Sequence, residues 1–109
     1  MADVNVVWGS GQTGAAEVAL VANTAKTVGF DRDLSEVEVA QVGAGTKPVY
    51  VAFVDANQPR AAAVPSANSA THCLPVYPNS AAVLPVRTDG NTLLSLISAE
   101  ATTVWVNAT

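Results

Sequence analysis

Hydrophobic and polar residues alternate one by one along much of this chain. The clearest case is EVEVAQV at residues 36–42, where the two glutamates fall on one face and the first two valines on the other. Because successive side chains of a strand point to opposite faces, this stretch predicts a half-buried strand with a solvated outer face.

Similar short runs recur about every ten residues, separated by glycine, proline and small polar residues. The expected strands are residues 16–22, 26–30, 36–42, 48–54, 82–87, 92–98 and 102–108, with a short extended piece at 71–78. No stretch keeps a helical period for more than a turn or two. The pattern predicts an all-β fold, a single-domain, mostly antiparallel β-sandwich of the jelly-roll kind, with a closed barrel as the alternative.

The connections carry predictions of their own. Residues 23–25 have the length of a hairpin turn between the first two of these strands. Pro75 and Pro78 confine the short piece at residues 71–78 to a sheet edge or to irregular backbone, and Pro85 indicates an edge strand, because proline lacks the N–H that an inner strand must donate. Residues 55–70 form a long, Ala- and Pro-rich loop, and a loop of that length in a small domain usually either has a function or lies on another part of the structure.

Two of the expected strands are apolar on both faces. In VYVAFV (residues 49–54) the first, third and fifth residues face one way, while Tyr50, Ala52 and Val54 face the other. In VWV, Trp105 points away from the valines on either side of it. One face can fill the core of a small domain, and the second face needs its own cover. That cover is either a second subunit or the chain's own loops.

The N-terminal residues read as a separate unit. VNVVW at residues 4–8 has the composition of a strand, and the glycine-rich GSGQTG that follows resembles a tether. The sequence therefore predicts an extended arm at residues 1–14 and a sandwich domain at 15–109. Val4, Val6 and Trp8 share one face of the arm, which is expected to dock on a neighbouring subunit or a capsid. The alternative is that Trp8 packs on its own domain.

Composition narrows the class of protein. The chain has 109 residues, of which 50% are hydrophobic and only 13% charged, about half the usual share. Its net charge of −4 and scattered basic residues argue against nucleic acid as a partner. The start of the chain lacks the pattern of a signal peptide, and no run is long enough for a membrane helix. Cys73 is the one cysteine, so no intrachain disulfide is expected.

Candidate chemistry is sparse. His72 precedes Cys73, but neighbouring residues of an extended segment point to opposite faces, so a small buried thiol and a rim imidazole are expected instead of a reactive pair. The acidic stretch DRDLSE at residues 31–36 lacks the glycine and the terminal glutamate of a calcium loop. The sequence predicts no enzyme, no metal site and no cofactor.

One part of the sequence resembles a known class of protein. From about residue 45 to the end, an apolar-aromatic strand is followed by an Ala/Ser-rich loop, then by LPVYP, AVLPVR, NTLLSLIS and the final TVWV. This order is similar to that of small virion proteins of tailed bacteriophages, such as head-decoration, cement or head-fibre-base modules. The resemblance implies a β-sandwich or jelly-roll, assembled in threes on a capsid surface.

The expected function is therefore structural: a decoration or cement protein that stabilises a phage head by binding major capsid subunits. Its partners would be further copies of itself, as a homotrimer, and the major capsid protein. It would be made in the host cytoplasm and located on the virion. The expected interface residues are Val4, Val6, Trp8, Tyr50, Val54, Tyr77 and Trp105. The alternative is a receptor- or glycan-binding module of a fibre or tail, with Tyr77 and Asn79 as the neighbours suited to a sugar.

Overall fold

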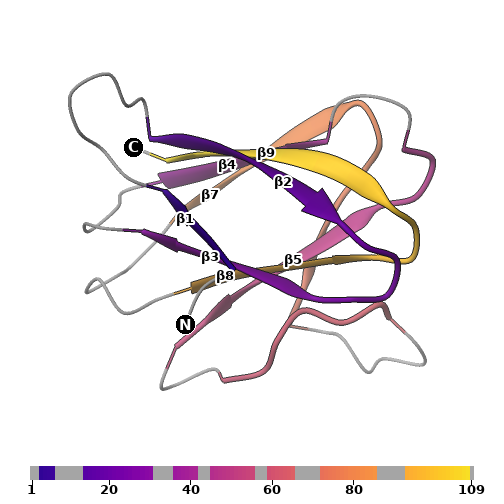
Figure 1. The fold of residues 1–109 in the computed structure, drawn as a ribbon, viewed down its shortest axis with the longest axis horizontal. Coiled ribbons are helices and arrows are strands. Elements are labelled where there is room, and N and C mark those ends of the chain that lie inside the picture. The colour runs from indigo at the N-terminus through magenta and orange to yellow at the C-terminus, as the bar shows by residue number, and fades with distance from the viewer. Residues whose placement is uncertain are drawn as a thin grey trace.

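A computed structural model describes residues 3–6, 14–30, 36–41, 45–55, 59–65, 72–85 and 93–108. Every regular element within these residues is a β-strand (Figure 1). The strands are β1 (Val4–Val6), β2 (Ala15–Leu20), β3 (Lys26–Phe30), β4 (Glu36–Gln41), β5 (Val49–Val54), β6 (Leu74–Val76), β7 (Ser80–Pro85), β8 (Leu93–Ser98) and β9 (Thr102–Ala108). The all-β prediction is confirmed.

The strands form two sheets that pack face to face as a sandwich (Figure 1). The five-stranded sheet has the order β1-β3-β8-β5-β6, and the four-stranded sheet has the order β2-β9-β4-β7. All pairings are antiparallel except that β1 runs parallel to β3. Because two separate sheets form, the sandwich interpretation is confirmed and the closed barrel is not.

The chain crosses between the sheets at almost every connection. Within the described strands, β5 and β6 are the only consecutive pair that share a sheet. The hairpin predicted at residues 23–25 is therefore wrong, because β2 pairs with β9 while β3 pairs with β8 and β1. The connection is a tight turn all the same, with Asn23 at a φ of 58° and the Thr24 amide donating to the Val21 carbonyl at 3.1 Å. A short turn fixes a change of direction but not which strands pair after it.

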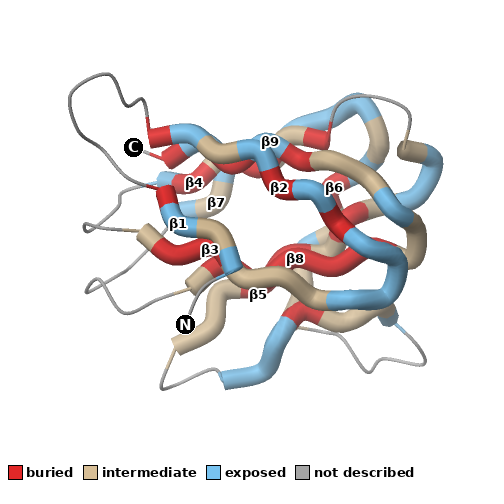
Figure 2. Tube along the Cα trace, viewed as in Figure 1, coloured by how far each residue is buried: buried red, intermediate tan, exposed pale blue. Residues whose placement is uncertain are grey.

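The inner faces of the two sheets form the core. Buried residues line the space between the sheets in Figure 2. The alternation in β4 is as predicted, with Val37 and Val39 fully buried and Glu36 exposed. The valines on either side of Trp105 are also fully buried. The core consists of Val6, Val18, Leu20, Val28, Val37, Val39, Val49, Val51, Val76, Leu94, Leu96, Val104, Val106 and Ala108.

One amide lies inside this apolar core. Gln41, at the end of β4, is 1% exposed, and its Nε2 donates to the Val76 carbonyl of the opposite sheet at 3.0 Å. Its Oε1 accepts a hydrogen bond from the Thr102 hydroxyl at 3.4 Å. A Cβ on Gly45 would fall 2.5 Å from that same Oε1, so residue 45 must lack a side chain for the amide to fit. Gln41 thus joins the two sheets by a buried hydrogen bond.

The N-terminal strand belongs to the sandwich of its own chain. Val4 to Val6 form β1 at the edge of the five-stranded sheet, and Val6 is 1% exposed within the core. Asp3 fixes the strand further, because its amide donates to the Thr27 carbonyl at 3.1 Å and its Oδ2 accepts from the Thr27 amide at 2.9 Å. The predicted arm is thus paired with its own domain at residues 4–6, since the edge of β3 offers free backbone groups. Trp8 lies outside the described residues.

Strand boundaries follow the sequence closely. The predictions for β3 and β9 match at both ends, and those for β5 and β8 start one residue early. β2 ends at Leu20 rather than at residue 22, and β7 begins at Ser80, two residues before its prediction. The proline argument is confirmed, because Pro75 and Pro85 lie in β6 and β7, the outermost strands at one side of each sheet.

Candidate functional site

The outer face of the five-stranded sheet is partly covered by the chain itself. Ala62 is 4% exposed and forms a second apolar cluster with Ala52 and Ile97, against which Tyr50 packs. The Ala62 amide donates to the buried Ser95 hydroxyl of β8 at 2.9 Å. The described part of the long loop therefore lies on this sheet, as the sequence predicted. Of the two covers considered for the second face of β5, its own loop supplies at least part.

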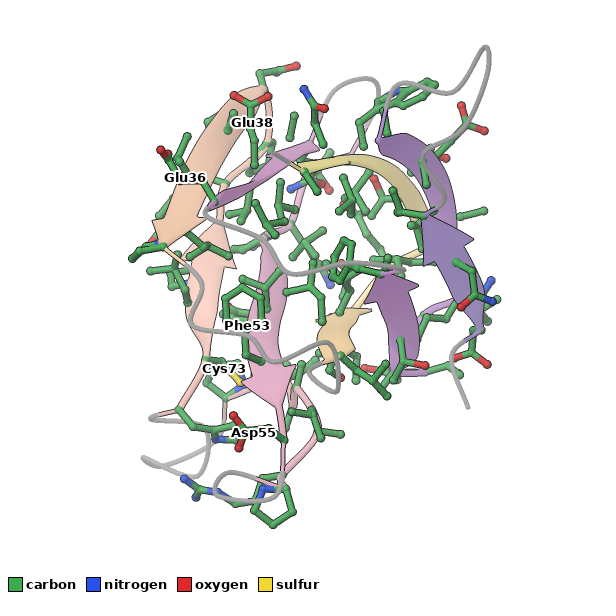
Figure 3. The ribbon with its side chains drawn as sticks, turned by 90° about the vertical axis from the view of Figure 1, so that its left-hand side faces the viewer. Glu36, Glu38, Phe53, Asp55 and Cys73 are labelled. Carbon is green, nitrogen blue, oxygen red and sulfur yellow. The ribbon has the colours of Figure 1, made fainter. Side chains whose placement is uncertain are left out.

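His72 anchors the same segment. Its Nε2 lies 2.8 Å from the Ala61 carbonyl and donates to it, because a carbonyl oxygen can only accept. The Nδ1 atom is buried and has no hydrogen-bond partner among the described residues. Cys73 is half-buried and packs against the second cluster, near Phe53 and Asp55 (Figure 3). The imidazole therefore holds the loop, and this hydrogen bond gives it a structural role.

The outer face of the four-stranded sheet is different, and we call it the Trp105 face. It consists of the outward residues of β2, β4, β7 and β9, namely Ala15, Glu17, Ala19, Glu36, Glu38, Ala40, Ala81, Val83, Pro85, Thr103, Trp105 and Asn107. Trp105 stands opposite Glu17 on β2 and opposite Ala40 on β4, and Ala81 of β7 follows Ala40 in the same row. This large aromatic therefore has a glutamate on one side and two alanines on the other, and 43% of its surface stays exposed.

Negative charge surrounds this tryptophan. Glu17, Glu36 and Glu38 all belong to the Trp105 face, and none of its described residues is a lysine or an arginine. Glu36 and Glu38 point outward from the sandwich in Figure 3. Together with Val83 and Asn107 they line a shallow, open depression of about 290 Å³. The face offers an exposed indole and carboxylates, a set suited to contacting a protein surface.

The structure separates the residues that the sequence grouped as an interface. Val4 is half-buried and packs against the core, and Val6 lies within it. Tyr50 and Val54 are half-buried on the outer side of β5. Two members are well exposed: Trp105 on the four-stranded sheet, and Tyr77, 60% exposed, on the turn between β6 and β7. Trp105 lies on a strand and Tyr77 on a turn, and the two are not brought together into one cluster. Whether any of the group contacts another subunit stays a prediction.

Sequence reasoning missed three exposed hydrophobic residues. Val83 is 55% exposed, Val21 57% and Leu74 41%. The alternation in β7 contained the signal for Val83, because its neighbours Ala82 and Leu84 pack against the core and Val83 must point the other way. Leu74 gave no such signal, since its exposure comes from the position of β6 at the sheet edge.

The described residues show neither a metal-binding cluster nor a membrane-spanning helix. Among them, no three His, Cys, Asp or Glu side chains gather as a metal would require. Most of the acidic stretch considered for calcium, residues 31–35, lies outside the described residues. No described segment is a helix of the length and hydropathy needed to cross a membrane.

Glu100 fixes the segment that enters β5. Its carboxylate accepts hydrogen bonds from the amides of Thr46 and Lys47, the latter at 2.7 Å, and from the Thr46 hydroxyl at 3.0 Å. These bonds stabilise the charged form, chiefly through the Thr46 amide and then the Lys47 amide. They hold the pKa of Glu100 below its ordinary value of 4.5. Sequence reasoning saw no role for this residue, because its partners are some fifty residues away in the chain.

The Glu100 interactions predict an acid-dependent stability. A carboxyl group with a lowered pKa in the folded state stabilises the fold above its unfolded pKa and loses that contribution as the pH falls through the folded value. The melting temperature should therefore fall between about pH 5 and about pH 3, and fall less steeply in Glu100→Gln, which keeps an acceptor oxygen but no charge. Thermal melts followed by circular dichroism measure this. Equal slopes for the two proteins would contradict it.

Comparisons with known proteins return no match: no family model, no curated protein and no solved structure is similar to this chain.

Proposed function

We propose that this chain is a structural protein of a tailed-phage particle, a decoration or cement protein that binds the major capsid subunits on the head surface. The observation that carries the proposal is Trp105, exposed on the flat outer face of a sheet whose other side fills the core. The same proposal includes a location on the virion, synthesis in the host cytoplasm and a non-enzymatic role. Support for the phage class comes from the sequence resemblance over residues 45–109.

Exposure of this tryptophan is unusual on energetic grounds. Tryptophan is among the most buried residues on average, and it is enriched where proteins meet. Covering the exposed 43% of its surface would remove roughly 100 Å² of mostly apolar area from water. At about 25 cal/mol per Å², that contributes on the order of 2–3 kcal/mol to binding. A contribution of that size makes Trp105 one anchor of a larger interface, because 2–3 kcal/mol alone is less than the roughly 4 kcal/mol that corresponds to a millimolar dissociation constant.

The charge on the Trp105 face indicates which chemistry its partner carries. Carboxylates beside an indole favour lysine or arginine side chains, which can pair with Glu17 while their stems or cationic groups contact Trp105. A capsid surface with a basic patch would fit. Self-association into a homotrimer is part of the proposal, following the same resemblance, with the copies touching through a different part of the surface.

A direct test uses heads assembled without decoration from the major capsid protein of the same genome. Trp105→Ala should bind these heads about 100-fold more weakly, as expected for the loss of a central anchor worth nearly 3 kcal/mol. Co-sedimentation across a range of protein concentrations gives the dissociation constants. Val21→Ala, which also truncates an exposed hydrophobic residue but on the turn after β2, is the matched control and should bind as the wild type does. Wild-type affinity in Trp105→Ala would refute the proposed contact.

One observation favours the receptor- or glycan-binding alternative. Tyr77 is 60% exposed and Asn79 is exposed on the same turn, where the Ser80 hydroxyl donates to the Tyr77 carbonyl at 2.7 Å. Exposed aromatic and amide groups held on a rigid turn suit a sugar ring. Binding to a glycan array that is lost in Tyr77→Ala, together with no binding to heads, would support this alternative over the capsid role.

A further inference from the structure

Exposed hydrophobic side chains gather at one side of the sandwich. Five large hydrophobic residues are exposed among the described ones, and three of them, Leu74, Tyr77 and Val83, belong to the single segment from β6 through β7. β6 is the last strand of the five-stranded sheet and β7 the last strand of the four-stranded sheet, and the two lie beside each other. We call this side, residues 73–85, the β6–β7 edge.

The backbone of β7 is open to pairing. Within the described part of the chain β7 pairs only with β4, so its other side presents free N–H and C=O groups. Folded proteins usually protect such an edge with charged side chains, prolines or bulges. β6 is protected by Pro75 at its centre, but β7 has neither a proline nor a charge before Pro85. Residues 80–84 are therefore an unprotected edge strand.

The lack of charge along the β6–β7 edge indicates which kind of partner can bind there. The chain carries a net charge of −4, yet residues 73–85 contain no Asp, Glu, Lys or Arg. In a closed ring of identical copies, the same residues converge around the symmetry axis, so any carboxylate placed there would repel its counterparts. A basic partner would instead be drawn to the acidic Trp105 face. The β6–β7 edge therefore fits a surface of equal neutrality, which is a second copy of the same edge.

The carboxylates nearest to the β6–β7 edge lie far enough from it that two copies meeting there would repel each other little. Glu36 and Glu38 lie on β4, one strand inside the edge. If two β7 strands met side by side, three interstrand spacings of about 4.8 Å would separate the β4 strands, or roughly 14 Å. That exceeds the screening length of about 8 Å at physiological salt, so the contact costs little in repulsion.

We infer that the β6–β7 edge is the surface through which copies of this chain associate, with β7 meeting a neighbouring copy and Val83 and Tyr77 buried in the contact. The inference rests on the proposed structural function and names its self-contact. The contact takes β7, the outermost strand of the Trp105 face, and leaves Trp105 itself, two strands further in on β9, to meet the capsid. Each β7 strand has one open side, so backbone pairing of β7 with β7 joins copies two at a time about a twofold axis. In the expected trimer the three edges would meet around the threefold axis through their side chains.

The test compares two substitutions of the same kind. Val83→Lys places a charge on the proposed contact. Val21→Lys is the control, because it places the same charge on a valine of nearly equal exposure. Val21 lies on the turn after β2, which is the opposite edge strand of the four-stranded sheet. Sedimentation equilibrium should show that Val83→Lys associates at least tenfold more weakly than the wild type, while Val21→Lys is unchanged. Circular dichroism checks that both remain folded, as expected for exposed positions.

A second measurement reports on the backbone of β7 directly. The amides of residues 80–84 should exchange hydrogen about tenfold more slowly at a protein concentration where the oligomer forms than at one where it dissociates. A wild-type protein that stays monomeric at about 100 μM, or equal association of the two lysine variants, would overturn the inference. Self-association of Trp105→Ala, which leaves the β6–β7 edge intact, is scored separately from its binding to undecorated heads, so the self-contact and the capsid role can fail independently. Protection of residues 80–84 that appears only when heads are added would mean that the edge binds another protein, which also overturns the inference.

Discussion

Replacing Gln41 with glutamate is expected to destabilise the protein by about 3–5 kcal/mol at neutral pH, because it puts an unpaired charge into the core. The side chain is 1% exposed, and its surroundings are the inner faces of both sheets. Its hydrogen-bond partners there are the Val76 carbonyl and the Thr102 hydroxyl, neither of which is a cation. Chemical denaturation followed by circular dichroism or tryptophan fluorescence measures the loss.

The pH dependence of this variant separates charge from shape. Burial raises the pKa of the new carboxyl group, so the folded state binds a proton more readily than the unfolded state, and stability increases as the pH is lowered. Gln41→Leu is the control of similar size. It leaves the Val76 carbonyl without its donor and should cost about 1–3 kcal/mol with no added pH dependence. If Gln41→Glu is as stable as Gln41→Leu at pH 7, and neither variant changes in stability at about pH 5, the Gln41 amide does not lie in the core as described.

The second large effect is expected from removal of residues 2–6. This truncation deletes β1 and with it the buried side chain of Val6, worth about 1.5–3 kcal/mol on its own. It also uncovers the edge of β3 and removes the Asp3–Thr27 hydrogen bonds. The melting temperature should fall by roughly 10–20 °C, using 4–8 °C per kcal/mol for a domain of this size.

Two point variants show whether the loss comes from β1 itself. Val6→Ala should reproduce a good part of the decrease, whereas Asn5→Ala, on the exposed side of the same strand, should have almost none. An arm that docks elsewhere, as the sequence predicted for residues 1–14, would leave the remaining domain folded when it is removed. A truncated protein that melts with the wild type would restore that interpretation and show that β1 pairs elsewhere in solution.

The local structure of this protein could be predicted from its sequence because it depends on short-range rules. Alternation in EVEVAQV placed Val37 and Val39 inside, and the same rule turned Trp105 away from the valines beside it. The prolines marked β6 and β7 as edge strands, since a missing N–H is tolerated only there. Each of these conclusions needs only the geometry of a strand and a residue's own chemistry.

The exposure of the candidate functional residues followed the sequence prediction only in part. The sequence indicated Trp105, because a large aromatic on a second apolar face needs a cover, and Tyr77, as the neighbour of Asn79 suited to a sugar. It also grouped Val4 and Val6 with them, although the structure buries Val6 against its own sheet. Alternation shows that a side chain faces one way, but a face can be covered by the same chain or by another, and the sequence pattern of the two cases is identical.

What only the tertiary structure decided is which segments meet. The turn at residues 23–25 could have closed a hairpin, but it carries the chain from one sheet to the other, where β2 pairs with β9 and β3 pairs with β8. Gln41 is an ordinary polar residue in the sequence, and only the fold brings Val76 and Thr102 to it. Glu100 likewise gains its role only when the fold brings Thr46 and Lys47, 54 and 53 residues before it, to its carboxylate. Strand pairing and buried hydrogen bonds join residues distant in sequence, and their free energy depends on the whole set of contacts that form together, so no local pattern encodes them.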